Sequence, residues 1–147
     1  MVVLFYQNKK KGLLMTELTQ NMTIPDNVEA NAYEIELFDS IPFNEEKSNE
    51  EQVFFCLGHW SDYNYLQIKK VIAIDNIADD KENFFEVNVS ELEKHNNLLV
   101  AILHTHPNNT IYPSNEDKEF LPKGIIGGIY QPITNHIIWW NAYKLNL

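Results

Sequence analysis

The order of apolar and polar positions along the chain predicts several β-strands. Residues 32–38 alternate apolar and polar positions as a half-buried strand does, although a helix also fits this pattern. Residues 53–58 and 98–104 are continuous apolar runs, which are typical of strands buried on both faces. Residues 84–89 alternate more weakly and form a further candidate strand. We therefore expect a sheet that contains at least two buried strands.

Glycine and polar residues between the apolar runs indicate two hairpins. Gly58 and the polar residues after it end the first buried run, and residues 65–74 return as a second strand. Residues 124–130 and 133–142 have the pattern of a closing hairpin that turns near residues 134–135. The chain shows no internal repeat, no low-complexity tract and no linker between these elements.

Helix signals are fewer than strand signals. Ser90 is a candidate N-cap for a short helix over residues 90–95, and a second helix is expected from Ser114 onward. The polar residues 44–52, which include four glutamates, fit either a solvated loop or a short helix. Because strands outnumber helices and both types share one chain, the pattern predicts an α/β domain.

Length and composition describe a single domain. With 147 residues, 44% hydrophobic and 22% charged, the chain suits one core, which we place at residues 31–147 after a weakly placed lead at residues 1–30. The single cysteine, Cys56, excludes an intrachain disulfide and is interpreted as a core residue. The apolar runs are too short to cross a bilayer, and Lys9–Lys11 follow the apolar residues 2–6, the reverse of a signal peptide. We expect a cytoplasmic protein without membrane contact.

The charge argues against nucleic acid as a partner. All eleven basic residues are lysines, and they face twenty-one acidic residues, which gives a formal net charge of −10. The phosphate backbone of a nucleic acid repels such a surface, and the chain has no arginine to form bidentate hydrogen bonds with phosphates.

The segment around residues 103–117 carries the candidate chemistry. His104 and His106 directly follow an apolar strand, and residues two apart on a strand point to the same side. Pro107 ends the strand there. Ser114 and Asp117 lie three apart at the start of the expected helix, so Asp117 completes a His, His, Asp set if the loop folds back. Three nitrogen and oxygen ligands with one vacant position are typical of a catalytic zinc site.

Simpler interpretations exist for each part of this segment. Ser114 and Asp117 have nearly the spacing of a capping box, so helix capping alone accounts for them. A pair of histidines two apart is often only polar surface. The order and spacing of all four residues together favour the metal site, and Ser114 can cap the helix and still meet a substrate.

These residues resemble a known family. The pattern H-x-H-P, six residues, S-x-x-D at His104, His106, Pro107, Ser114 and Asp117 is the signature of the JAMM (MPN-plus, JAB) metalloproteases. The family also uses an upstream glutamate followed seven residues later by a glycine that ends a buried strand, and Glu51 and Gly58 have that form. The resemblance covers residues 51–142.

The resemblance implies a fold, an activity and a role for each residue. It implies a curved mixed β-sheet flanked by helices, of the JAB/MPN type and cytidine-deaminase-like. A Zn²⁺ ion would be held by His104, His106 and Asp117, with Glu51 as the base that takes a proton from water and Ser114 as donor to the oxyanion. The reaction would be hydrolysis of a peptide or isopeptide bond in the flexible C-terminal tail of a ubiquitin-like or sulfur-carrier protein.

The chain departs from the family pattern near the glutamate. Relatives commonly place a small residue three positions after it, where this chain has Phe54, and a charged run replaces the usual amphipathic helix before it. Glu50 is therefore a rival for Glu51, and strand parity allows only one of the two to face the metal. The seven-residue spacing to Gly58 favours Glu51. No second cysteine–histidine cluster of the kind that holds a distal loop in some deubiquitinases is present.

Two other functions remain open from the sequence, and several residues are assigned no role. One alternative is a non-catalytic MPN-type scaffold, and the other is a DNA-repair-associated JAB protein, against which the acidic charge argues. Thr105 is interpreted as packing, and one of Trp139 and Trp140 is expected to be buried while the other could join Tyr112 on a partner surface. The remaining histidines are interpreted as surface residues: His59, His95 and His136. The oligomeric state is not predicted.

Overall fold

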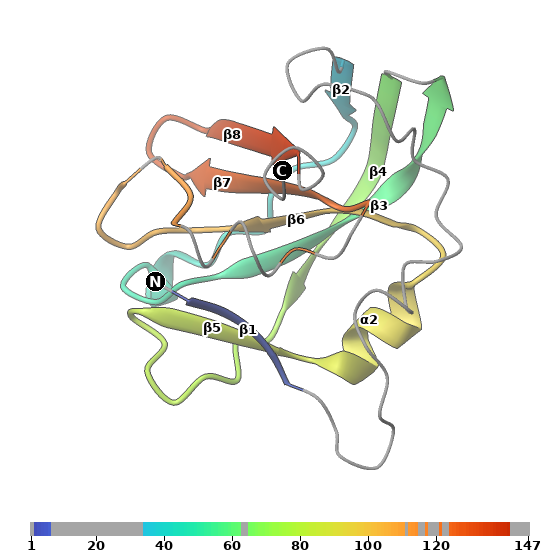
Figure 1. Ribbon diagram of the computed structural model, residues 1–147. Helices are drawn as coiled ribbons and strands as arrows, with labels where there is room; N and C mark the ends of the chain where they lie inside the picture. Colours follow the sequence, from blue (N-terminus) through green and yellow to red (C-terminus); the bar gives the residue numbers. More distant parts are fainter. Residues whose placement is uncertain are drawn as a thin grey trace.

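In a computed structural model of the chain, the elements that lie within the described residues are eight strands, one α-helix and one 3-10 helix (Figure 1). The described residues are 2–6, 34–62, 65–110, 112–114, 117, 121 and 124–141. In chain order, the elements are β1 (Val2–Tyr6), β2 (Glu34–Leu37), η2 (Glu45–Lys47), β3 (Val53–Asp62), β4 (Tyr65–Ile74), β5 (Phe84–Asn88), α2 (Val89–His95), β6 (Leu99–His104), β7 (Ile126–Gln131) and β8 (His136–Asn141).

Six of the strands form one mixed sheet in the order β2-β4-β3-β6-β7-β8. The β3–β4 and β7–β8 neighbours are antiparallel hairpins, β3 also runs antiparallel to β6, and β6 runs parallel to β7. The sheet is curled, and a second, two-stranded sheet pairs β1 with β5 in parallel (Figure 1). The predicted mixed sheet and both hairpins are therefore confirmed, and the strand interpretation of residues 32–38 is confirmed for Glu34–Leu37.

Helices are sparser than the predicted fold requires. In the part of the chain that the structure describes, α2 has seven residues and η2 has three, so the expectation of a sheet flanked by helices is met only in part. The helix expected from Ser114 lies largely outside the described residues. No helix among the described residues is long and apolar enough to cross a bilayer.

The start of α2 differs from the prediction. The N-cap is Asn88, whose backbone is extended and whose side-chain oxygen accepts a hydrogen bond from the Ser90 backbone N–H. Ser90, the predicted cap, lies inside the helix, so that prediction was wrong. Both residue types cap helices well, and the backbone conformation at the end of β5 decides between them.

Gly58 does not end β3, contrary to the prediction. The strand continues to Asp62 and carries a bulge between Leu57 and Gly58. A Cβ atom at Gly58 would overlap the backbone carbonyl oxygen of Gln67 on β4, so only glycine fits this close approach.

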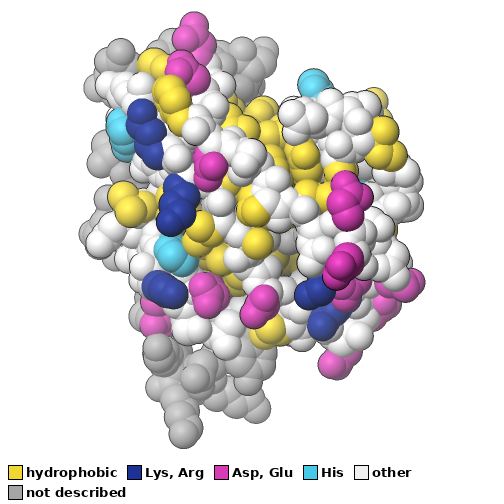
Figure 2. Space-filling view, turned by 180° about the vertical axis from the view of Figure 1, so that it is seen from behind, with side chains coloured by type: hydrophobic (Ala, Val, Ile, Leu, Met, Phe, Trp, Pro, Cys, Tyr) yellow, Lys and Arg dark blue, Asp and Glu magenta, His cyan; other side chains and the backbone are white. Residues whose placement is uncertain are grey.

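Side chains that alternate along β3 divide the core into two clusters. Val53, Phe55 and Leu57 pack in one cluster, whereas Phe54 and Cys56 pack in the other. Cys56 is fully buried, and burial raises the pKa of its thiol, so its interpretation as a core residue is confirmed. Hydrophobic side chains gather in a band across the middle of the face seen in Figure 2, with charged side chains at the margins.

The N-terminal part of the chain is described only at β1, which pairs with β5. Residues 7–33 lie outside the described residues, so the predicted boundary between the lead and the domain at residues 30–31 stays a prediction.

Candidate metal centre

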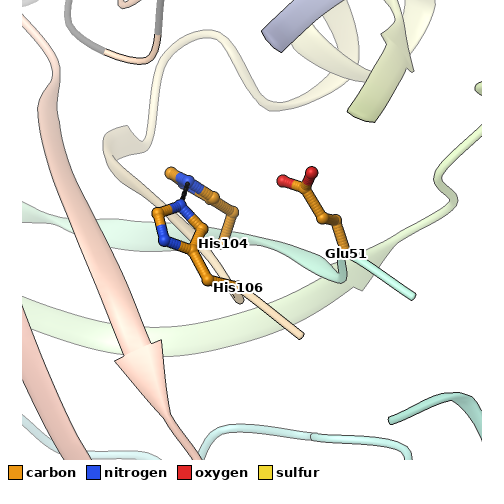
Figure 3. Close-up of side chains that lie close together, drawn as sticks. All are labelled: Glu51, His104 and His106. Carbon is orange, nitrogen blue, oxygen red and sulfur yellow. Dashed lines mark hydrogen bonds between the residues drawn. The ribbon is translucent and has the colours of Figure 1, made fainter. Parts of the chain in front are cut away.

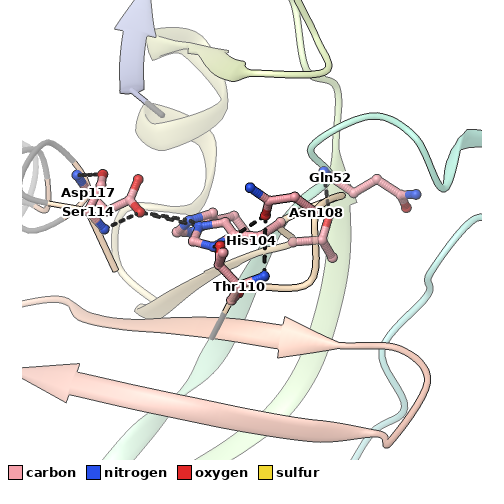
Figure 4. A network of polar contacts seen from close by, with 8 residues as sticks. Gln52, His104, Asn108, Thr110, Ser114 and Asp117 are labelled. Atoms are coloured by element: carbon pink, nitrogen blue, oxygen red, sulfur yellow. Dashed lines mark hydrogen bonds and ion pairs between the residues drawn. The ribbon is translucent and has the colours of Figure 1, made fainter. Parts of the chain in front are cut away.

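Three predicted ligands converge where β6 ends. His104 is the last residue of β6 and His106 follows two residues later, which places their Nε2 atoms 2.8 Å apart (Figure 3). Asp117 Oδ2 lies 3.3 Å from each of these Nε2 atoms (Figure 4). All three side chains are buried. The return of the chain to β6, on which the zinc hypothesis depended, is therefore present in the structure.

The triangle formed by these atoms has the size that a small cation needs. Ligand atoms bound at 2.0–2.1 Å to a tetrahedral zinc ion lie about 3.3 Å from one another. Two edges of the triangle, from Asp117 to His104 and to His106, have that length, and the third is 2.8 Å. The donor set of two imidazoles and one carboxylate is one that zinc accepts.

Glu51, and not Glu50, stands beside the imidazoles. The register of β3 against β6 pairs Val53 with His104, and Glu51 lies two residues before Val53 on the same side of the chain. A Glu51 oxygen and the two histidine nitrogens all lie within 4.8 Å of one another, and the three side chains point to the same side of the sheet (Figure 3). Glu50 is only half-buried, and it is not part of the group that Glu51 forms with the two histidines.

The Glu51 carboxylate is buried without a hydrogen bond. Its side chain is fully buried, and neither Oε1 nor Oε2 has a hydrogen-bonding partner among the described residues. The Oδ1 atom of Asp117 is likewise buried without a hydrogen-bonding partner among the described residues. Buried polar atoms are normally paired, and unpaired ones point to a water molecule or an ion at the site. A cation between these carboxylates and the imidazoles fits this observation.

The charges of the site follow from burial and from mutual contact. Burial, and to a lesser extent the charge of Asp117, raises the pKa of the Glu51 carboxyl to about 8. Burial lowers the pKa of His104, which favours the neutral ring that a metal needs. Burial would raise the pKa of Asp117, but hydrogen bonds with His104 and His106 outweigh it and hold that pKa well below its usual range. A cation would also favour the ionised form of Glu51.

Ser114 and Asp117 are joined by two hydrogen bonds, each from the backbone N–H of one residue to the side chain of the other. The Ser114 N–H donates to Asp117 Oδ2 at 2.9 Å, and the Asp117 N–H donates to Ser114 Oγ at 3.0 Å (Figure 4). This is the reciprocal arrangement of a capping box. The same contact directs Oδ2 of Asp117 toward the histidines, so capping and ligand placement coincide here.

Comparison with known families decides where this chain belongs. Residues 23–143 match the family model described as prokaryotic homologues of the JAB domain. The chain belongs to this JAB family. Comparison with curated proteins found no match. All the motif residues lie within the matched segment, and the structure brings the side chains of Glu51, His104, His106 and Asp117 together as the JAB resemblance implied.

Two residues that support the JAB site were not recognised in the sequence. The Thr105 hydroxyl, interpreted as packing, accepts a hydrogen bond from the Gln52 N–H at 2.8 Å, and the Thr105 N–H donates to the Gln52 carbonyl at 2.9 Å. Asn76 donates from Nδ2 to the carbonyls of Glu51 and Phe84. These contacts hold the peptide group between Glu51 and Gln52 and the Gln52 carbonyl, directly after the Glu51 side chain. Both reach across elements distant in sequence, so no local pattern signals them.

The other candidate residues are not part of the candidate metal centre. His59 and His136 are exposed, and His95 is half-buried on α2, with its Nε2 3.8 Å from a Glu91 carboxylate oxygen. Tyr112 is 74% exposed and stays a candidate for a partner surface. Trp139 is partly buried against the second core cluster, and the side chain of Trp140 is not among those described.

Proposed function

We propose that this JAB-family protein is a zinc-dependent peptidase or isopeptidase. The observation that carries the proposal is the buried, unpaired carboxylate of Glu51 beside two imidazoles and the Asp117 carboxylate. A purely structural site would gain nothing from a buried carboxylate without a partner, since such a group costs stability. A group that has to exchange protons with a substrate needs that freedom.

Each residue of the site has a role in this reaction. His104 Nε2, His106 Nε2 and Asp117 Oδ2 would hold the zinc ion, which supplies Lewis acidity and makes water easier to deprotonate. Glu51 accepts a proton from the attacking water on one Oε atom and delivers it to the leaving amine. Ser114 Oγ donates a hydrogen bond to the oxyanion of the tetrahedral intermediate, which is worth about 3 kcal/mol by analogy with other oxyanion donors.

The burial of the site favours a thin, extended substrate. The exposed fraction is 5% or less for each of the four residues, namely Glu51, His104, His106 and Asp117. Residues buried to this extent favour a narrow, extended substrate segment over a broad folded surface. We therefore propose the flexible C-terminal tail of a ubiquitin-like or sulfur-carrier protein as the substrate.

Metal content and one matched pair of variants test the proposal. We expect about one zinc ion per chain by elemental analysis of protein never exposed to chelator, as the three-ligand site requires. Glu51→Gln should keep zinc and the fold but lose hydrolysis by about 10² to 10⁴-fold, the usual contribution of a general base. Cleavage is measured by mass on a panel of ubiquitin-like fusions, and Glu50→Gln is the control.

The outcomes separate the candidate functions. A folded protein without transition metal, or Glu51→Gln with undiminished turnover, would refute the catalytic proposal. Zinc without cleavage of any fusion, together with stable binding of one of them, would support the scaffold alternative. DNA binding that weakens with salt would support the DNA-repair alternative.

A further inference from the structure

The ring of His106 is held on the side that faces away from the metal centre. Its Nδ1 atom lies 3.0 Å from the backbone oxygen of Thr110 and 2.9 Å from the Thr110 hydroxyl. Thr110 is in turn tied to Asn108, because its N–H and its hydroxyl lie 3.2 Å and 2.9 Å from Asn108 Oδ1 (Figure 4). The three residues form a short relay that ends on a candidate ligand.

The donors and acceptors along this relay can be assigned one after another. A backbone N–H can only donate, so the amide atom of Asn108 that meets the Thr110 N–H must be its oxygen. That oxygen can only accept, so the Thr110 hydroxyl donates its hydrogen to Asn108. The hydroxyl then offers a lone pair to His106 Nδ1, and the Thr110 carbonyl offers another.

This assignment determines the tautomer of His106. Both Thr110 oxygens accept, so Nδ1 must carry the proton that makes these two contacts hydrogen bonds. In the neutral ring, Nε2 then holds a lone pair. The hydrogen bond between Nε2 and Asp117 Oδ2 in the metal-free site needs a second proton on Nε2, which a bound metal ion would replace. Nε2 is the atom that lies 3.3 Å from Asp117 Oδ2 and 2.8 Å from His104 Nε2, at the proposed metal position.

The local backbone keeps Thr110 in place. The Asn109 N–H donates to the His106 carbonyl at 2.9 Å, which closes a turn through Pro107. Asn109 has a φ of 63°, a conformation that asparagine tolerates better than most residues. The relay therefore belongs to the same turn that carries His106 away from β6.

We propose that Thr110, supported by Asn108, is a positioning residue that fixes His106 as the Nδ1–H tautomer and directs its Nε2 lone pair at the metal. The inference rests on the proposed metal site, to which it adds two residues outside the family motif. Partners of this kind typically change metal affinity by 10 to 100-fold when they are lost.

Two measurements on the whole protein test the role of Thr110. The first is the tautomer of His106 in the wild type, from long-range ¹H–¹⁵N correlation spectra of chelator-treated and zinc-loaded protein, where we expect Nδ1–H in both. The second is zinc affinity by competition with a chromophoric chelator. Thr110→Val should weaken zinc binding about tenfold, since the backbone carbonyl remains as an acceptor. Thr110→Ser should bind zinc as the wild type does.

Controls keep the inference separate from the proposed function. Thr134→Val replaces an exposed threonine in the turn between β7 and β8 and should leave zinc affinity unchanged. An Nε2–H tautomer at His106, or wild-type zinc affinity in Thr110→Val, would overturn the inference while the metal site stands. A wild type that binds no zinc would instead overturn the proposed function. If Thr110→Val does not fold, the wild-type spectra still decide the tautomer.

Discussion

The neighbouring strands β3 and β6 carry buried apolar side chains in the middle and polar side chains at one end. In the middle, Phe54 pairs with Leu103 and Cys56 pairs with Ala101, and all four side chains are fully buried and apolar. At the end, the register pairs Val53 with His104, and the polar site begins. Among the described residues, the buried polar or charged side chains all belong to this end: Glu51, His104, Thr105, His106 and Asp117.

The difference shows that the two regions serve different purposes. Burial of apolar side chains in the middle stabilises the fold by about 1.5–3 kcal/mol for each large residue. At the polar end, three carboxylate oxygens of Glu51 and Asp117 are buried without partners. Each such group costs about 1–3 kcal/mol. The free energy gained by burying apolar side chains in the middle of the sheet thus offsets the cost of burying the unpaired carboxylate oxygens at its polar end.

The largest effect is expected from the apolar middle. Phe55→Ala removes a fully buried ring from the first core cluster and should lower the free energy of unfolding by about 3–5 kcal/mol. Phe38→Ala, at a half-exposed position where the ring meets Lys69, should cost about 1 kcal/mol or less. Urea unfolding measures both. Equal losses would contradict the assignment of the core to β3.

Zinc should stabilise the polar end to a similar extent. Binding to the folded state alone adds about 4 kcal/mol at a free zinc concentration one thousand times Kd. Phe55→Ala should show the same gain, because its site is intact, whereas His106→Ala should show almost none. His59→Ala, at an exposed histidine, is the matched control. The gain appears as a shift in the urea midpoint, and its persistence in His106→Ala would place the metal elsewhere.

A pH-dependent effect comes from the charge of Glu51 in chelator-treated protein. Its pKa in the fold is about 8, above the ordinary 4.5, so the folded state binds the proton more tightly. Stability should therefore fall as pH rises from 4.5 through 8. Glu51→Gln removes this slope and should be more stable than the wild type at pH 8 by up to about 4 kcal/mol, the free energy that corresponds to a pKa of about 8 in place of 4.5 at that pH. Unfolding curves at several pH values check this, with Glu50→Gln as control; parallel curves for wild type and Glu51→Gln would be contrary evidence.

Particular residues show how far the sequence predicts this protein. The strand β4 was predicted with its observed bounds, because its pattern of apolar positions is local. The motif named the four side chains that the structure brings together at the candidate metal centre. Gly58 was misinterpreted as a strand end, since its close neighbour, the Gln67 carbonyl, belongs to another strand. Thr105 was assigned to packing because its partner, Gln52, is 53 residues away.

The position of His104 and His106 on one side of the chain needed only the sequence, because alternation along a strand is a property of the backbone itself. The meeting of these rings with Glu51 depended on the register of β3 against β6, and their meeting with Asp117 depended on how the chain returns after Pro107. Both are set by packing and hydrogen bonds between segments far apart in sequence, which no local pattern encodes. The tertiary structure alone also buried the Glu51 carboxylate without a partner, and this feature carries the functional proposal.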